Sequence, residues 1–155
     1  MIKPSVIRVP CKHIIVNGLK DKKTKDTIKT AFKVSNLLDC KRVTIVEEIS
    51  QAELDIKVND DTSLRKTNIA KERIKKREDL RVEKILSEID CKETTLKIQS
   101  IFGRRGYSIG HYAKVKRADL LIMNAPSKTK LIDRIFPHDI EYILSELPTD
   151  LLIVK

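Results

Sequence analysis

The sequence predicts one α/β domain over residues 1–155, with an open five-stranded parallel sheet and helices on both faces. The main observation is that short apolar runs alternate with longer segments of helical periodicity, as in β-α-β units. A length of 155 residues with 41% hydrophobic residues also suits a single packed core. Because aromatic residues are only 4% of the chain and Trp is absent, that core must consist mainly of Ile, Leu and Val.

The first predicted strand and helix follow Pro10. Residues 13–16 (HIIV) form a short apolar run, which predicts strand one. The apolar side chains of residues 22–38 mostly recur every three or four positions, which predicts a helix. Asp21 and Thr24 are the candidates for its N-cap, since either side chain can accept a hydrogen bond from a free backbone N–H group.

The second predicted strand leads into a long helix. Residues 43–46 (VTIV) are β-branched throughout, which favours a strand buried on both faces. Residues 50–63 look irregular and contain an Asn-Asp-Asp turn signal. Residues 64–89 then predict a helix whose apolar stripe is confined to its second half, while residues 65–77 are rich in Lys and Arg. We expect this helix to dock through its C-terminal half and to project its basic half into solvent.

The remaining chain continues the same alternation. A Gly-Arg-Arg-Gly turn at 103–106 ends the third strand, and Pro137 interrupts the last helix. The predicted elements are strands at 94–101, 120–123 and 151–154 and helices at 107–117 and 131–147.

Right-handed crossovers between these parallel strands give an open sheet with helices on both faces. In such sheets, ligands bind outside the carboxyl ends of the strands, where the strand order reverses. The predicted ligand-binding edge therefore comprises the loops after strands one and four, at residues 17–21 and 124–130.

Three stretches near the C-terminus form a recognisable series, and the spacing between them matches without a gap: 118–123 (ADLLIM), 141–144 (EYIL) and 148–154 (PTDLLIV). They resemble the A-D-L-I-V-M strand, the E-Y-V-L helix and the final strand of the universal stress protein family. Residues 12–38 resemble that family's first strand and helix. The resemblance covers nearly the whole chain and implies the family's Rossmann-like fold. Gly103, Ile109 and Ala113 also match.

The same resemblance implies that the family's usual ATP site is degenerate here. Its ATP-binding members carry G-x-x-G, nine residues, then G-S or G-T after strand four, because glycine lets backbone N–H groups approach phosphate. The four matching positions are Asn124, Ser127, Pro137 and His138, and Pro137 has no N–H to donate. The family's Asp at the end of strand one falls on Leu19, which has no carboxylate.

An anion could still be held by side chains. The polar loop after strand four and the Gly-Arg-Arg-Gly turn would together form a basic mouth at the predicted cleft. The ordinary interpretations, a solvated turn and a polar loop entering a helix, stay open beside this one. The candidate residues are Arg104, Arg105, Ser127, Lys128, Thr129, Lys130 and His138.

The charge of the chain suggests a different class of partner. Lys and Arg total 32 against 22 Asp and Glu, a net charge of +10 that would attract nucleic acid, an anionic membrane surface or an acidic surface of an unknown protein partner. The basic half-helix at 65–77 is the candidate docking site. Glu72, Glu78 and Asp79 dilute its charge, so a plain solvated face is the alternative.

Neither catalysis nor metal binding is predicted. The sequence contains no recognisable nucleophile–base motif, and His13, His111 and His138 have no metal-ligand spacing. The three cysteines are widely separated and odd in number, which favours free thiols in a reducing cytoplasm.

These observations lead to one preferred function and two alternatives. The preferred function is a non-catalytic stress-response or regulatory domain without ATP or another cofactor. The resemblance implies a homodimer, paired through the final strand. The alternatives are ATP or AMP binding through the Ser/Lys/Thr loop, and a basic adaptor for nucleic acid or membranes. The predicted interface residues are Leu151, Leu152, Ile153 and Val154.

Overall fold

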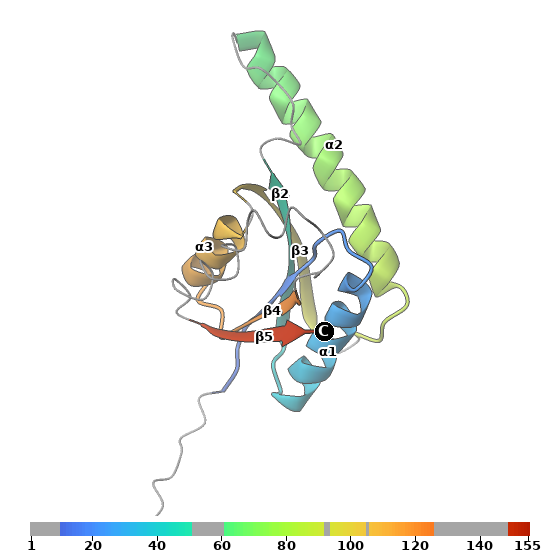
Figure 1. Cartoon of the computed structure of the whole chain (residues 1–155). Coiled ribbons are helices and arrows are strands. Elements are labelled where there is room, and N and C mark those ends of the chain that lie inside the picture. The colour runs from blue at the N-terminus through green and yellow to red at the C-terminus, as the bar shows by residue number, and fades with distance from the viewer. Residues whose placement is uncertain (1–9, 51–60, 92–93, 105, 126–148) are drawn as a thin grey trace, which may run out of the picture.

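A computed structural model describes residues 10–50, 61–91, 94–104, 106–125 and 149–155 (Figure 1). From β1 to β4, strands and helices alternate in it as the hydrophobic pattern predicts. The elements are β1 (Ile14–Asn17), α1 (Thr24–Leu37), β2 (Arg42–Ser50), α2 (Asp61–Leu86), β3 (Thr95–Gly103), α3 (Tyr107–Val115), β4 (Leu120–Asn124) and β5 (Asp150–Val154).

The five strands form one parallel sheet in the order β3-β2-β1-β4-β5. The predicted open five-stranded sheet is therefore confirmed. The strand order reverses between β1 and β4, so the carboxyl ends of these two strands define the switch point. The predicted helix at 131–147 lies outside the described residues.

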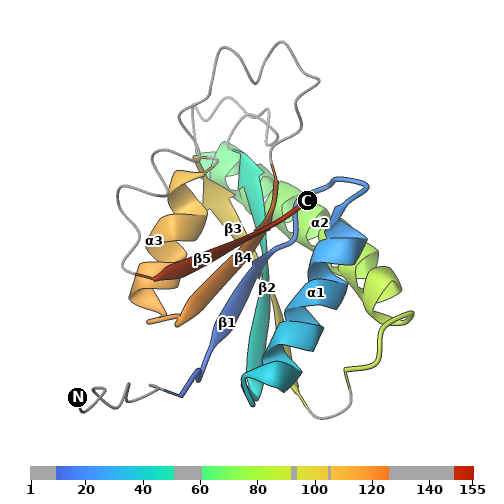
Figure 2. The same cartoon turned by 60° about the horizontal axis from the view of Figure 1, so that its bottom comes forward.

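Helices cover both faces of the sheet (Figure 2), because successive strand residues point to opposite sides. Ile14 and Val16 of β1 pack with α1 and α2 in one apolar cluster. Ile15, between them, belongs to a second cluster with Ile109 and Ala113 of α3. Both clusters consist largely of aliphatic side chains, as the low aromatic content requires.

The start of α1 differs from the prediction. Lys23 is the N-cap residue, and no side chain of the described residues forms a capping hydrogen bond to the helix. The Asp21 carboxylate instead accepts a hydrogen bond from the backbone N–H of Lys23 at 2.9 Å. The Thr24 hydroxyl donates to the carbonyl of Leu19. The prediction of an Asp21 or Thr24 cap was therefore wrong, because both side chains fix the loop that precedes the helix.

Strand β2 is longer than predicted. The sequence pattern marked residues 43–46, but the strand continues through Glu47 and Glu48 to Ser50. Its additional residues pair in register with β3, from Glu47 opposite Ser100 to Ser50 opposite Gly103. Two carboxylates, those of Glu47 and Glu48, therefore lie within the sheet near its carboxyl edge, just beyond the predicted strand.

Helix α2 projects beyond the sheet as expected. Val82, in its C-terminal half, is fully buried in the core. The N-terminal half extends past the tips of β2 and β3 (Figure 1). Among the described residues, no helix is both long enough and apolar enough to cross a membrane.

Candidate functional site

Two asparagines mark the switch point of the sheet. Asn17 ends β1 and Asn124 ends β4, and they are 2% and 6% exposed. The Asn124 amide nitrogen donates to the Thr24 hydroxyl at 3.1 Å, and that hydroxyl donates to the carbonyl of Leu19. The Oδ1 atoms of Asn17 and Asn124 are buried, and neither has a hydrogen-bond partner among the described residues. The switch point thus holds two unused acceptors, which a buried ligand donor or water would satisfy.

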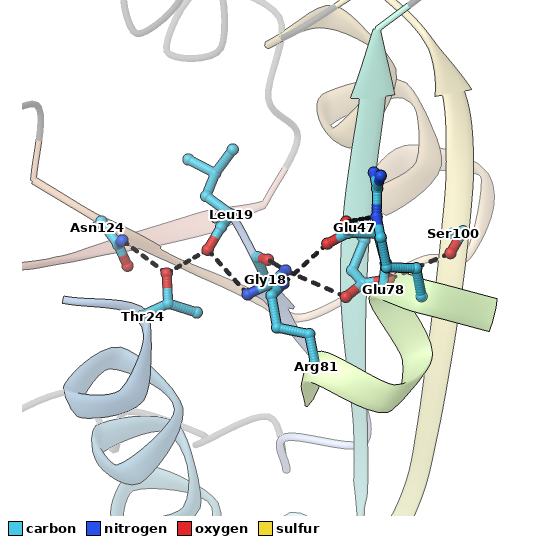
Figure 3. A network of polar contacts seen from close by, with 9 residues as sticks. Gly18, Leu19, Thr24, Glu47, Glu78, Arg81, Ser100 and Asn124 are labelled. Atoms are coloured by element: carbon cyan, nitrogen blue, oxygen red, sulfur yellow. Dashed lines mark hydrogen bonds and ion pairs between the residues drawn. The ribbon is translucent and has the colours of Figure 1, made fainter. Parts of the chain in front are cut away.

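Arg81 of α2 closes the loop after β1. Its guanidinium donates to the carbonyls of Gly18 and Leu19, the latter at 3.4 Å (Figure 3). The same group contacts Glu47 at 3.1 Å and donates from Nε to Glu78 at 2.8 Å. An arginine suits this position because its planar fork offers five donors in fixed directions. Helix α2, the first loop and β2 are therefore joined by one side chain.

Glu47 lies at the centre of this polar cluster. It is 2% exposed, and it accepts a hydrogen bond from the Ser100 hydroxyl at 3.2 Å. Burial raises the pKa of its carboxyl to about 7, although the Arg81 charge and the Ser100 hydrogen bond oppose that rise. The carboxyl therefore titrates near neutral pH.

Glu78 behaves in the opposite way. Burial would raise the pKa of this carboxyl, but hydrogen bonds and charges from Arg81 and Arg77 outweigh burial and hold the pKa below its ordinary value. Glu78 is consequently the ionised partner of Arg81 across the neutral range.

Gly18 allows this loop to pass close to β2. Its backbone N–H donates to the Val46 carbonyl at 2.8 Å. A Cβ atom at this position would lie 2.9 Å from Ile45 Cγ2 and 3.3 Å from Glu47 Cγ. The close approach therefore requires glycine, and the reason is packing against β2.

Glu48 satisfies the N-terminus of α3. Its carboxylate accepts hydrogen bonds from the N–H groups of Gly106, Ser108 and Ile109, at 2.9, 3.1 and 3.3 Å. A helix N-terminus attracts anions, and here the Glu48 carboxylate of the same chain is that anion. The backbone donors beside Arg104 are thus already occupied, which weakens the predicted anion site at this turn.

The structure places only part of the predicted basic mouth. Arg104 is exposed at the end of β3. The other candidates all lie outside the described residues, so the basic mouth stays a prediction. These candidates are Arg105, Ser127, Lys128, Thr129, Lys130 and His138, together with Pro137.

Sequence reasoning missed the residues that organise this edge. Glu47 and Glu48 directly follow a β-branched run, so their position at the carboxyl end of a strand was a usable signal. Arg81 had a weaker signal: Glu78 precedes it by about one helical turn, and both residues come just before the apolar stripe that begins at Val82. Its contacts with Gly18 and Glu47 had no local signature.

The remaining reactive groups among the described residues do not form a site. Burial and the adjacent Cys40 raise the pKa of the Cys11 thiol to about 12, so this thiol stays protonated. Burial lowers the pKa of His13, whose Nε2 lies 2.8 Å from the Thr44 hydroxyl. Within the described ranges, no group of three His, Cys, Asp or Glu side chains could hold a metal ion.

Neither the family models nor the curated proteins compared with the chain include a match. Solved structures do match. UspA from Lactobacillus plantarum, a universal stress protein, is 12% identical with a TM-score of 0.67, covering 96% of this chain and 100% of its own. Hypothetical protein MJ0577 is 19% identical with a TM-score of 0.69, covering 95% and 97%.

A third structure, a universal stress protein in complex with cAMP, is 14% identical with a TM-score of 0.59 and covers 95% of this chain and 98% of its own. These likenesses extend over nearly the full length of each chain. They confirm the Rossmann-like fold of the universal stress proteins that the sequence resemblance implied.

Proposed function

We propose that this chain is a non-catalytic regulatory domain of the universal stress protein type, which acts as a cytoplasmic homodimer without the family's usual ATP binding. The Arg81 cluster carries the proposal. It engages the carbonyls of Gly18 and Leu19, which would otherwise face a ligand at the first loop. A loop whose backbone carbonyls are already hydrogen-bonded has less to offer a nucleotide.

The replaced family positions support the same conclusion. Leu19 stands where the family has an Asp, so its side chain cannot accept hydrogen bonds from a nucleotide. Asn124 stands where the first glycine of the phosphate loop is expected, and its side chain is tied to Thr24. Both ends of the switch point therefore bind other parts of the chain.

The second candidate function is nucleotide binding by a non-standard loop. The observation that favours it is the pair of buried Oδ1 atoms of Asn17 and Asn124, which have no hydrogen-bond partner in the described part of the chain. Two acceptors at a switch point would suit the amino or hydroxyl groups of a nucleoside. Ser127, Lys128, Thr129 and Lys130 would then contact phosphate.

A nucleotide screen separates these two functions. We expect gently purified protein to show no bound nucleotide by native mass spectrometry, and no heat of binding with ATP, AMP or cAMP by calorimetry. Saturable binding of any of the three would contradict the leading proposal. If binding occurs, an Asn17→Leu variant should weaken it, whereas the exposed-site control Lys33→Gln should not.

The proposed dimer predicts a specific effect at the sheet edge. Within the described ranges, β5 pairs only with β4, and Ile153 is 40% exposed on it. An open apolar edge favours pairing with a second copy. Ile153→Lys should therefore convert dimers to monomers in light scattering, while Leu37→Lys, at a position 84% exposed on α1, should leave the mass unchanged. A monomeric wild-type protein at high concentration would rule out this interface.

A further inference from the structure

The N-terminal half of α2 carries much of the chain's excess positive charge. Residues 64–77 contain seven Lys or Arg and one acidic residue, Glu72, which is a net charge of +6 out of +10 for the whole chain. We call the exposed side chains of this segment the projecting basic surface. The segment is about 20 Å long, since each helical residue rises about 1.5 Å.

The acidic residues that dilute this charge in the sequence do so less in the structure. Glu78 is buried and lies against Arg77 and Arg81. Asp79 is partly buried, and its Oδ1 is among the buried oxygen atoms. Only Glu72 of the three acidic residues is exposed. The projecting basic surface is therefore more positive than its sequence suggests.

Five cations of this surface are free to bind another molecule. All five are exposed, and none forms an ion pair within the described part of the chain: Arg65, Lys66, Arg73, Lys75 and Lys76. By contrast, the Lys71 ammonium lies 5.4 Å from the centre of the Phe102 ring, which fixes it against the end of β3. Arg104 is exposed two residues beyond Phe102, so the positive charge continues onto the sheet edge.

The exposed apolar residues do not form a membrane-binding face. Leu64 and Ile69 are 56% and 44% exposed, but they are five residues apart and therefore lie on different sides of the helix. An interfacial membrane helix needs a continuous apolar face, usually with aromatic residues, and residues 64–77 contain no aromatic residue. The lack of aromatic side chains also disfavours stacking on single-stranded bases.

We propose that the projecting basic surface binds the phosphate backbone of a nucleic acid duplex without base specificity. Charge complementarity carries this proposal. A duplex has one negative charge per about 1.7 Å of its axis, so a helix of this length can lie beside about a dozen of them. The five unpaired cations provide the contacts, and Arg104 extends the positive surface at the sheet edge.

The test measures binding of the full chain to a short fluorescent DNA duplex of mixed sequence by anisotropy, from roughly 50 to 200 mM salt. The variant is Lys66→Gln/Arg73→Gln/Lys76→Gln. Its control, Lys22→Gln/Lys29→Gln/Lys33→Gln, removes the same charge from exposed positions in and before α1. We expect the α2 variant to lose at least tenfold in affinity and its log–log salt slope to fall by about three. The control should retain the wild-type slope.

Several results would overturn the proposal. One is failure of the wild-type chain to bind the duplex at the lowest salt. Another is an equal loss of affinity in the two variants, since equal loss would indicate an effect of net charge alone. Tighter binding to a single-stranded oligonucleotide, or to phosphatidylserine vesicles in the absence of duplex binding, would also contradict it. Circular dichroism on both variants checks that the helices remain folded.

Discussion

Replacing Arg81 with alanine is expected to lower the free energy of unfolding by about 3–5 kcal/mol at pH 8. The substitution removes the cationic partner of the buried Glu47 carboxyl, whose pKa then rises further because the Arg81 charge no longer opposes the effect of burial. It also frees Glu78 from its 2.8 Å contact and leaves the carbonyls of Gly18 and Leu19 without the guanidinium donors. Urea unfolding followed by circular dichroism measures the loss.

A double variant identifies the cause of that loss. Arg81→Met combined with Glu47→Gln removes both charges and keeps similar volume, so it should recover a large part of the lost stability. Lys84→Ala, at an exposed position on the same helix, is the control and should change stability by less than about 0.5 kcal/mol. If the double variant is as unstable as Arg81→Ala, the charge pair is not the cause.

The stability of the chain is expected to depend on the ionisation of Glu47. Burial raises the pKa of this carboxyl from 4.5 to about 7 in the folded state. Between pH 4.5 and pH 7 the folded chain keeps a proton on Glu47 that the unfolded chain has lost. The free energy of unfolding therefore falls as the pH rises through this range. The full contribution is on the order of 3 kcal/mol. This stabilisation by the protonated Glu47 carboxyl is fully present below pH 4.5 and lost above pH 7.

Glu47→Gln isolates this contribution from other titrating groups. The amide stays neutral and keeps a group that can bond to Ser100 and Arg81. Urea unfolding at pH 5 and pH 8 should therefore show the variant gaining stability relative to wild type at the higher pH. Parallel pH dependences for the two proteins would show that Glu47 does not titrate near neutrality.

The two experiments address one structural question. If both outcomes hold, the first loop is closed by a charged cluster whose strength changes with the protonation of Glu47. The loop in question, Gly18 and Leu19, is the edge at which a Rossmann-like sheet would admit a ligand. The two results would therefore test the proposal that the carbonyls of this loop are engaged by the chain itself.

The sequence by itself determined the elements and their arrangement. Apolar runs located the strands, helical spacing located α1, and the docked half of α2 was visible from the stripe beginning at Val82. These features are local, because periodicity and β-branching act over a few neighbouring residues. The right-handed crossover rule then limited the ways in which the strands could be ordered.

Only the tertiary structure decided how the polar groups at the carboxyl edge are used. Glu47 and Arg81 are 34 residues apart, and Arg81 and Gly18 are 63 apart, so no local pattern relates them. Glu48 likewise reaches Gly106 across 58 residues. Buried polar groups must find partners wherever packing brings them, and packing depends on the whole chain. The sequence therefore fixes where this edge lies, while the folded chain fixes which of its charges remain available to a partner.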